Sequence, residues 1–476
     1  MLKTFEALQL SPDLITVVQD LGYTQPTPIQ IEAIPPLLAG RNVIAQSQTG
    51  SGKTAAFGLP ILQGFEVERR ELQALVICPT RELSAQVARE MRKLGREHNG
   101  LQVVELVGGQ PSRTQRDKLE RGAHVAIGTP GRVLDLLERG FLIPDSIRTV
   151  VLDEADRVLD MGFGDDVRKI INHLPKERQT ALFSATFPKS IEELSEQFQP
   201  RSQSEALRIT IENNDEELAD IRQLKLNYGT QGYDDKLATL CWTLHAHLPA
   251  EGSALVFCNQ KATVREIHKE LRDGGLSADR FDGDLEQFDR DQVLARFRNG
   301  SVRVLIATDV AGRGLDVEGL DLVINYDLPE QTENYVHRIG RTGRAGASGI
   351  AISLIRNDKD IVEIEAFTGQ KIELLDDSAS KDSEFDDLLK QLSAASKMET
   401  ILISGGRQDK VHKGDILGAL TGDAGGLNGK DIGKIEVQDK LSYVAVSQGV
   451  ISDAVSRLNK GRIKGKRFKA THVGRK

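Results

Sequence analysis

Short apolar runs alternate with longer segments of mixed polarity along most of the chain. Thr149–Leu152 is such a run, and two others lie at Ala74–Pro79 and His124–Thr129. An uninterrupted apolar run of this length is typical of a parallel strand, because helices cover both faces of a parallel sheet. Strands that alternate with helical segments therefore predict an α/β fold.

The same pattern recurs later in the chain. Ala254–Asn259 repeats the run at 74–79, and Arg303–Thr308 repeats the run at 124–129, each about 180 residues further on. We interpret the recurrence as two copies of one α/β unit, and chance similarity between buried strands is the alternative. Asp234–Trp242, which precedes the second set, predicts a helix without a glycine-rich loop. The two copies are therefore expected to differ in chemistry.

A glycine-rich loop precedes the first helix of the first copy. Ser47–Thr54 matches the phosphate-binding pattern, except that Ser47 replaces its first glycine. In that pattern backbone N–H groups surround the β-phosphate, Lys53 reaches the β- and γ-phosphates, and the Thr54 hydroxyl ligates Mg²⁺. A glycine-rich turn without a ligand is the alternative for this segment alone.

Two adjacent acids follow the apolar run at 149–152. Parallel strands deliver such acids to the carboxyl edge of the sheet, where ligands bind. Asp153 is predicted to lie near the magnesium ion and Glu154 near the attacking water. A solvated edge is the alternative, but the loop and the acids together indicate a protein that binds ATP or GTP with magnesium and hydrolyses it.

The second copy carries an arginine-rich string, His337–Arg344. Its Arg341 and Arg344 are one helical turn apart, and an arginine that reaches a transferring phosphoryl group accelerates transfer by about 10³–10⁵-fold. Hydrolysis is then expected to depend on closure of the two copies. A surface segment that is merely rich in arginine is the alternative.

The chain from about residue 399 predicts a further small domain. Its pattern predicts strand 400–404, helix 413–420, strands 432–437 and 441–446, helix 451–458 and strand 467–473. This βαββαβ order is the ferredoxin-like plan of the RRM. The central strands offer only Tyr443 for stacking on bases, so RNA binding is assigned to basic residues: Lys460, Arg462, Lys464, Lys466 and Arg467. A nonspecific basic tail is the alternative.

Composition adds little to this picture except a charge asymmetry. The 476 residues are enough for about three domains. The net charge of -8 hides a basic segment, because 457–476 holds nine Lys or Arg and no acid, whereas 376–387 is acidic. No apolar run approaches the ~18 residues that cross a bilayer, and a signal-peptide pattern is absent, so a cytoplasmic protein is expected. The spacing of the three cysteines suits neither a disulfide nor a zinc site.

These motifs together resemble the DEAD-box RNA helicases of superfamily 2 over roughly residues 1 to 365. Besides the phosphate loop and Asp153–Asp156, the first copy has Gly22–Gln30 with Phe5 upstream, Pro79–Leu83, Gly108–Gly109, Thr129–Arg132 and Ser184–Thr186. The second copy has Asn259–Gln260, Gln287–Arg290, Ala307–Asp316 and His337–Arg344. The resemblance implies two tandem RecA-like domains at 1–208 and 218–367, an acidic linker at 368–398 and an α+β RRM-like domain at 399–476.

The resemblance also implies site residues. The nucleotide would be ATP, because the Gln30 amide would read the adenine edge, and the catalytic residues would be Lys53, Asp153, Glu154, Arg341 and Arg344. The nucleotide contacts would be Phe5, Gln25, Gln30, Gln48, Thr49, Gly50, Ser51, Gly52, Lys53, Thr54 and Asp316, with Mg²⁺ on Thr54 and Asp153. Coupling between ATP and the interdomain cleft would use Ser184, Thr186 and His337. RNA would contact Arg81, Gly109, Gly131, Arg132, Thr308 and Arg313.

The last domain looks like that of the bacterial DbpA group of DEAD-box proteins, on the strings Lys413–Asp423, Asp431–Ile435 and Gly461–Lys466. That resemblance implies an ATP-dependent RNA helicase that is targeted to 23S ribosomal RNA during assembly of the large ribosomal subunit. A monomer is expected, because no segment of the sequence indicates a dimer interface. A non-unwinding, ATP-gated RNA clamp or annealing protein is the alternative. A DNA translocase is a weaker third reading, which the motif around Gln30 disfavours.

Overall fold

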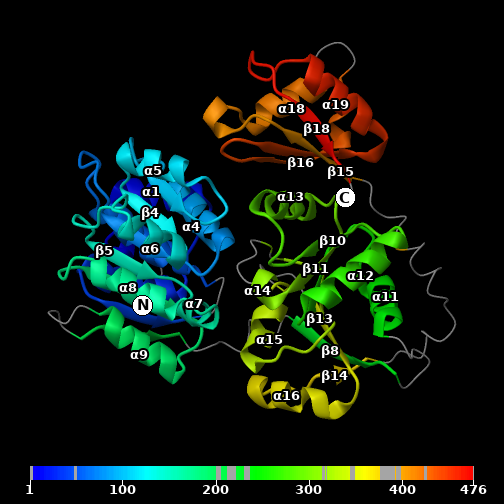
Figure 1. Ribbon diagram of the computed structural model, residues 1–476, viewed down its shortest axis with the longest axis horizontal. Helices are drawn as coiled ribbons and strands as arrows, with labels where there is room; N and C mark the ends of the chain where they lie inside the picture. Colours follow the sequence, from blue (N-terminus) through cyan, green and yellow to red (C-terminus); the bar gives the residue numbers. More distant parts are fainter. Residues whose placement is uncertain are drawn as a thin grey trace. The chain divides into compact units, whose positions relative to one another are not determined.

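The computed structural model describes residues 4–47, 51–199, 205–211, 221–229, 236–312, 317, 319–343, 349–375, 392, 398–422 and 426–474. The chain forms two compact units. Unit 1 comprises residues 1–214 with 314–316, and unit 2 comprises residues 215–313 with 317–476. Unit 1 is drawn in blue to blue-green and unit 2 in green to red in Figure 1.

Unit 1 contains a parallel sheet whose described strands have the order β3-β4-β2-β5-β6-β1-β7. The strands are β1 (Val43–Gln46), β2 (Ala74–Ile77), β3 (Val103–Leu106), β4 (Val125–Gly128), β5 (Thr149–Leu152), β6 (Gln179–Ser184) and β7 (Leu207–Thr210). The helices are η1 (Phe5–Leu8), α1 (Pro12–Asp20), α2 (Pro28–Leu38), α3 (Lys53–Gly64), α4 (Arg81–Leu94), α5 (Ser112–Glu120), α6 (Pro130–Glu138), α7 (Ala155–Asp160), α8 (Gly164–His173) and α9 (Lys189–Phe198).

Alternate side chains of each strand in unit 1 enter two separate cores, because successive strand residues point to opposite faces of a sheet. Val76 and Ile127 join the core beneath α1 to α4, whereas Leu75 and Ala126 join the core beneath α6 to α9. Both faces of the sheet are therefore covered by helices (Figure 1). The carboxyl edge of the strands is left to the loops that carry the candidate chemistry.

Unit 2 begins with a second parallel sheet, of order β10-β11-β9-β12-β13-β8-β14. The strands are β8 (Ile221–Asn227), β9 (Ala254–Cys258), β10 (Ala278–Phe281), β11 (Val304–Thr308), β12 (Leu322–Asn325), β13 (Gly349–Ile355) and β14 (Glu373–Leu374). The helices are α11 (Lys236–His247), α12 (Lys261–Asp273), α13 (Gln287–Arg298), α14 (Asp309–Gly312), α15 (Thr332–Ile339), η2 (Asp358–Ile361) and α16 (Val362–Thr368).

The two sheets have the same strand order once β8 is matched to β1 and each later strand to its counterpart. This agreement confirms the predicted fold class of two tandem parallel-sheet domains. The helix predicted at 234–242 is α11, which begins at Lys236 within the described residues and ends later than expected, at His247.

The rest of unit 2 is a four-stranded antiparallel sheet of order β16-β17-β15-β18 with two helices against it. Its elements are β15 (Met398–Ile403), η4 (Arg407–Asp409), α18 (Lys413–Thr421), η5 (Gly429–Asp431), β16 (Ile432–Val437), β17 (Ser442–Ser447), η6 (Gln448–Val450), α19 (Ile451–Lys460) and β18 (Ala470–Val473). The predicted βαββαβ order is confirmed.

The start of the last strand was predicted wrongly. We expected a strand from residue 467, but β18 begins at Ala470. Residues 463 and 466 instead close a tight turn through reciprocal backbone hydrogen bonds, and the Lys469 N–H donates to the Ser404 hydroxyl rather than to a strand partner. The basic segment before Ala470 thus forms an exposed turn, not a strand.

The four-stranded sheet contacts α13 within unit 2. The Arg298 guanidinium donates two hydrogen bonds to Glu436, at 2.7 and 3.0 Å. Just beyond the helix, Asn299 and Ser301 make hydrogen bonds with the Thr400 hydroxyl. Among the described helices of the whole chain, none is long and apolar enough to cross a membrane.

Candidate functional site

The loop between β1 and α3 holds the predicted phosphate-binding residues. The Lys53 ammonium, which is 6% exposed, donates to the Ser47 carbonyl at 3.0 Å, and the two serine hydroxyls of Ser47 and Ser51 lie 3.2 Å apart. Gly52 directly precedes α3 with φ of 92°, a left-handed conformation that glycine adopts without strain. Thr54 is half-buried in the first turn of α3. The Lys53 side chain therefore folds back onto the loop rather than extending into solvent.

The Gln30 amide connects this loop to helix α2. Its Oε1 accepts from the Thr27 N–H at 3.0 Å, and its Nε2 donates to the Gly52 carbonyl at 3.1 Å. A Cβ at Gly52 would lie 2.4 Å from Gln30 Nε2, so a side chain at this position would displace the Gln30 amide. The predicted adenine reader thus also holds the end of the phosphate loop, a contact that sequence reasoning did not anticipate.

Phe5 and Gln25 both precede this connection in the sequence but differ in burial. Phe5 is 3% exposed, belongs to the core beneath α1 to α4 and stacks on Tyr23 with ring centroids 6.2 Å apart. The Phe5 ring is therefore part of the hydrophobic core. Gln25 is exposed in the loop before α2, where its amide is accessible to a ligand.

Asp153 and Glu154 follow β5 directly, as predicted, and both are buried. Burial, together with the charge of the neighbouring Glu154, raises the pKa of Asp153 to about 7, although the positive charge of Lys53 opposes the shift. Glu154 has a φ of 50°, a conformation that non-glycine residues rarely adopt. The chain therefore turns sharply at Glu154, from the end of β5 into α7.

Arg157 neutralises Glu154 from the next turn of the chain. Its Nη1 lies 2.7 Å from Glu154 Oε2, and the two side chains are 2% and 7% exposed. Sequence reasoning missed this residue. The i,i+3 spacing of an acid and an arginine was the available signal, since residues three apart at the start of a helix lie on one face.

Asp156 joins the acids to the predicted coupling residues. Its Oδ2 accepts from the N–H of Ala185 and from both the N–H and the hydroxyl of Thr186, at 3.0 to 3.2 Å. In return, the Asp156 N–H donates to the Ser184 hydroxyl at 3.2 Å. Ser184 and Thr186 are thus brought into contact with the segment that carries Glu154, although this geometry does not itself test their predicted role.

Four predicted RNA contacts of unit 1 lie just after adjacent strands, in the loop or the first helical turn that follows each strand. Arg81 follows β2, Gly109 follows β3, and Gly131 with Arg132 follows β4, and these strands are neighbours in the sheet. The Arg81 guanidinium lies beside Gly108, and Arg132 Nη1 donates to the Gln110 carbonyl at 3.5 Å. Gly109 and Gly131 are exposed, so a phosphate can approach their backbone N–H groups closely.

In unit 2 a buried arginine links the ends of several strands. Arg338 on α15 is 2% exposed and donates to both carboxylate oxygens of Asp309, at 2.6 and 2.7 Å. It also donates to the side chain of Asn259 at 2.9 Å and to that of Asn325 at 3.1 Å. Thr308, a predicted RNA contact, ends β11 immediately before Asp309 and is buried.

The expectation that Arg341 and Arg344 share a helix is wrong. Helix α15 ends at Ile339 and is capped by Gly340, so Arg341 lies beyond the helix and is buried at 5% exposure. The Thr342 hydroxyl and the Arg341 carbonyl both bond to Leu320, which draws the chain away from the helix axis. His337 is half-buried in the last turn of α15.

The strand end of unit 2 that matches Asp153 carries a different ion pair. Lys236, the first described residue of α11, lies 2.7 Å from Asp327 Oδ1. The Lys236 ammonium also lies 5.0 Å from the ring centroid of Tyr228 and 4.4 Å from that of Tyr326. Asp327 Oδ2 accepts from the Asn259 N–H at 3.0 Å, so both carboxylate oxygens have partners.

Six predicted site residues lie outside the described residues: Gln48, Thr49, Gly50, Arg313, Asp316 and Arg344. Most of the predicted acidic linker lies outside them as well.

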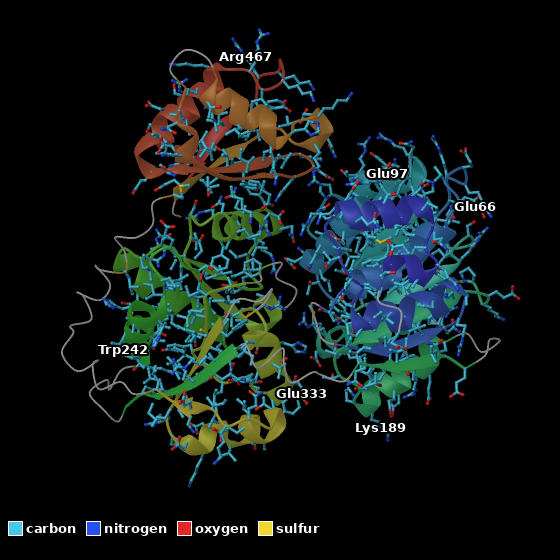
Figure 2. The ribbon with its side chains drawn as sticks, turned by 180° about the vertical axis from the view of Figure 1, so that it is seen from behind. Glu66, Glu97, Lys189, Trp242, Glu333 and Arg467 are labelled. Carbon is cyan, nitrogen blue, oxygen red and sulfur yellow. The ribbon has the colours of Figure 1, made fainter. Side chains whose placement is uncertain are left out.

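The C-terminal sheet offers no aromatic stacking surface at Tyr443. This side chain is 1% exposed, and burial raises its pKa, with Asp291 of α13 and Glu436 acting in the same direction. The predicted basic residues are instead exposed. We call four of them the basic turn: Arg462, Lys464, Lys466 and Arg467. Figure 2 shows Arg467 at the outer surface of this domain.

Three family models match the chain in sequence order. A DEAD/DEAH box helicase model matches residues 27–194, a helicase conserved C-terminal domain model matches 235–346, and a DbpA RNA binding domain model matches 400–472.

Similar proteins and structures agree with these models. The chain is 45% identical to the ATP-dependent RNA helicase DbpA of Escherichia coli over 96% of both chains, and 36% identical to that of Bacillus subtilis over 99% of both. It also resembles Saccharomyces cerevisiae Dbp5 bound to RNA and ADP BeF3, with a TM-score of 0.71, 32% identity and coverage of 82% of this chain and 100% of that one.

Proposed function

The chain belongs to the DEAD-box ATP-dependent RNA helicases, with a DbpA-type RNA-binding domain, and we propose that it remodels 23S ribosomal RNA during assembly of the large ribosomal subunit. It is an RNA-dependent ATPase and helicase. The proposal adds the RNA target, the residue roles, a cytoplasmic location and a monomeric state. The choice of RNA target rests on the exposed basic turn of the C-terminal domain.

The ATP site in the proposal uses the buried residues at the carboxyl edge of the first sheet. Lys53 binds the β- and γ-phosphates, and Gln30 reads adenine. The Thr54 hydroxyl and the Asp153 carboxylate are hard oxygen donors, which suit Mg²⁺, and bound Mg²⁺ offsets the charge that develops on the phosphates. Asp153 is buried beside Lys53 with a raised pKa, so a cation there would favour its ionised form.

Hydrolysis in the proposal needs residues of both sheets. Glu154 orients the attacking water from the end of β5. Arg341 and Arg344 supply positive charge to the transferring phosphoryl group when the two domains close, and His337 with Ser184 and Thr186 couples that closure to RNA. Arg341 reaches the phosphate from a loop rather than from a helix.

RNA binding in the proposal is divided between the core and the C-terminal domain. Exposed glycines and half-buried arginines after β2, β3 and β4 contact phosphates and sugars, which carry no base sequence. The C-terminal domain supplies the preference for one RNA. Its Tyr443 is buried beside α13, so the basic turn and its flanking loops bind the RNA rather than the sheet face.

Alanine at all four positions of the basic turn tests the target. We expect the variant to need about 10–100-fold more 23S RNA fragment for half-maximal ATPase activity, because lost phosphate contacts weaken binding and flatten its salt dependence. Activity with unrelated RNA at saturation should stay within about twofold, since the core contacts remain. The matched control removes four exposed lysines elsewhere: Lys169, Lys176, Lys189 and Lys269.

Equal loss with 23S and unrelated RNA, or an equal effect of the control, would contradict the assigned target. Strand separation of a short duplex joined to the 23S fragment is measured in the same samples. Hydrolysis without strand separation would favour the alternative of an ATP-gated clamp.

A further inference from the structure

Arg157 is a buried cation that the proposed chemistry does not use. Its guanidinium is 2% exposed and lies 2.7 Å from Glu154 Oε2. A buried ion is tolerated only when a partner offsets its lost hydration. The pairing itself is therefore unsurprising, but its place is informative, because the partner is the acid to which the hydrolytic water is assigned.

The backbone on both sides of Arg157 is held firmly. Its own N–H donates to Asp156 Oδ1 at 2.9 Å, while Asp156 Oδ2 is bound by Ala185 and Thr186. Ala155 and Val158 on the same helix are fully buried in the core beneath α6 to α9. The guanidinium therefore projects from a fixed helix turn, and its position relative to β5 is set by packing.

The surrounding contacts fix the position of Glu154, although its backbone conformation is unfavourable. Its φ of 50° puts it in the left-handed region, which is unfavourable for a non-glycine residue. Glu154 is the N-cap residue of α7, and its carboxylate meets Arg157 three residues later in that helix. The contact engages Oε2. A carboxylate fixed through one oxygen presents the other in a defined direction.

We propose that Arg157 is a positioning residue for ATP hydrolysis, which holds Glu154 through Oε2 so that Oε1 faces the attacking water. This inference rests on the proposed role of Glu154. A water-orienting group must be held within a fraction of an ångström, and misplacement by about 1 Å can cost about 10²-fold in rate. In this proposal Arg157 affects hydrolysis through Glu154, without a contact of its own to the reacting atoms.

Arg157→Met and Arg157→Lys test the idea in the full-length protein with saturating RNA. We expect kcat to fall about 10–100-fold in the methionine variant and less in the lysine variant, which restores a charge but not the planar fork. The KM for ATP and the affinity for a fluorescent ATP analogue should stay within about threefold. A change confined to kcat is the mark of a group that acts on the transition state.

Arg178→Met is the matched control. Arg178 is another buried arginine of unit 1, at 6% exposure, but it donates to the carbonyls of Pro175 and Phe198 rather than to an acid. Its loss should lower the melting temperature while kcat stays within about twofold below that temperature. An equal fall of kcat in this control would show that any buried arginine has the same effect and would overturn the proposal.

The double variant with Glu154→Gln separates positioning from other roles. Single-turnover phosphate release with enzyme in excess is measured for each single variant and for the pair. If Arg157 acts through Glu154, the methionine should cause no further loss in the glutamine background, as residues that act as a unit are not additive. A further loss of the same 10–100-fold would overturn the proposal.

The possible failures remain distinguishable. Wild-type turnover of Glu154→Gln would remove Glu154 from its proposed role, whatever Arg157 does. Reduced turnover of that variant together with unchanged kcat in both Arg157 variants would overturn only the present inference. If Arg157→Met does not fold because Glu154 loses its partner, Arg157→Lys and the double variant, which has no unpaired charge, decide the question.

Discussion

The two parallel sheets share one strand order but use the same strand end differently. In the first sheet, β5 ends in Asp153 and Glu154 beside a glycine-rich loop. In the second, the corresponding β12 is followed by Tyr326 and Asp327, and a lysine at the start of α11 pairs with Asp327 at 2.7 Å. The described lysine at this strand end is therefore already paired with a carboxylate.

The residues around Lys53 and Lys236 explain why the two strand ends differ. Ser47 and Tyr228 occupy matching places, because each directly follows the strand at that position and donates its N–H to the end of the neighbouring strand, at Ser184 and Ile355 respectively. Where the first sheet continues into glycines, the second has a tyrosine ring against the Lys236 ammonium. A common fold thus supports nucleotide chemistry only where the loop leaves space and charge for it.

Removal of each lysine gives the largest expected difference between the sheets. Lys53→Ala should lower RNA-stimulated turnover by at least about 10²-fold, because it removes a cation aimed at the phosphates. Lys236→Met should leave kcat and the KM for ATP within about threefold, and it should destabilise unit 2 because Asp327 loses its ion partner. Steady-state ATPase assays and thermal melts measure both effects.

A large loss of turnover in Lys236→Met, without a loss of folded protein at the assay temperature, would break the comparison. It would mean that the ion pair in the second sheet takes part in chemistry.

The stability of unit 2 gives a second test of the comparison, through Arg338. Arg338→Met should destabilise unit 2 by roughly 3–5 kcal/mol, because the partly buried Asp309 would lose the cation that pairs with both of its oxygens. Urea unfolding followed by Trp242 fluorescence reports on unit 2, since this tryptophan lies in α11. The unfolding of unit 1 should not change. An effect below about 1 kcal/mol would show that solvent or another cation replaces Arg338.

Sequence patterns predicted the strands better than the partners of the site residues. The runs at 74–79 and 149–152 identify strands because the apolar pattern is local. The pair of Lys236 and Asp327 joins residues 91 positions apart, and only the fold brings them together. Arg341 was assigned to a helix from spacing alone, whereas Gly340 ends the helix before it.

The smallest expected effect concerns a pair of matching helices. Position eight of α4 is the buried Ala88, and position eight of α12 is His268. Burial lowers the pKa of His268, and Arg272, Arg280 and Arg296 lower it further, while the backbone contact with Ala278 opposes them. Asp279 faces the ring at 4.0 Å but is itself bound by Arg296 at 2.7 Å. The folded protein therefore keeps this imidazole neutral to lower pH than the unfolded chain does.

The sign of the pH effect follows from this depressed pKa. As pH falls below about 6.5, the unfolded chain takes up a proton that the folded chain does not, so stability is lost by up to about 1.4 kcal/mol per pH unit. His268→Gln should remove that part of the slope in urea unfolding between pH 7.5 and 5.5. His247, whose pKa is also lowered by burial, stays in both proteins and cancels in the difference. Identical slopes would mean that His268 has the same pKa in the folded and the unfolded chain, contrary to the effect of burial.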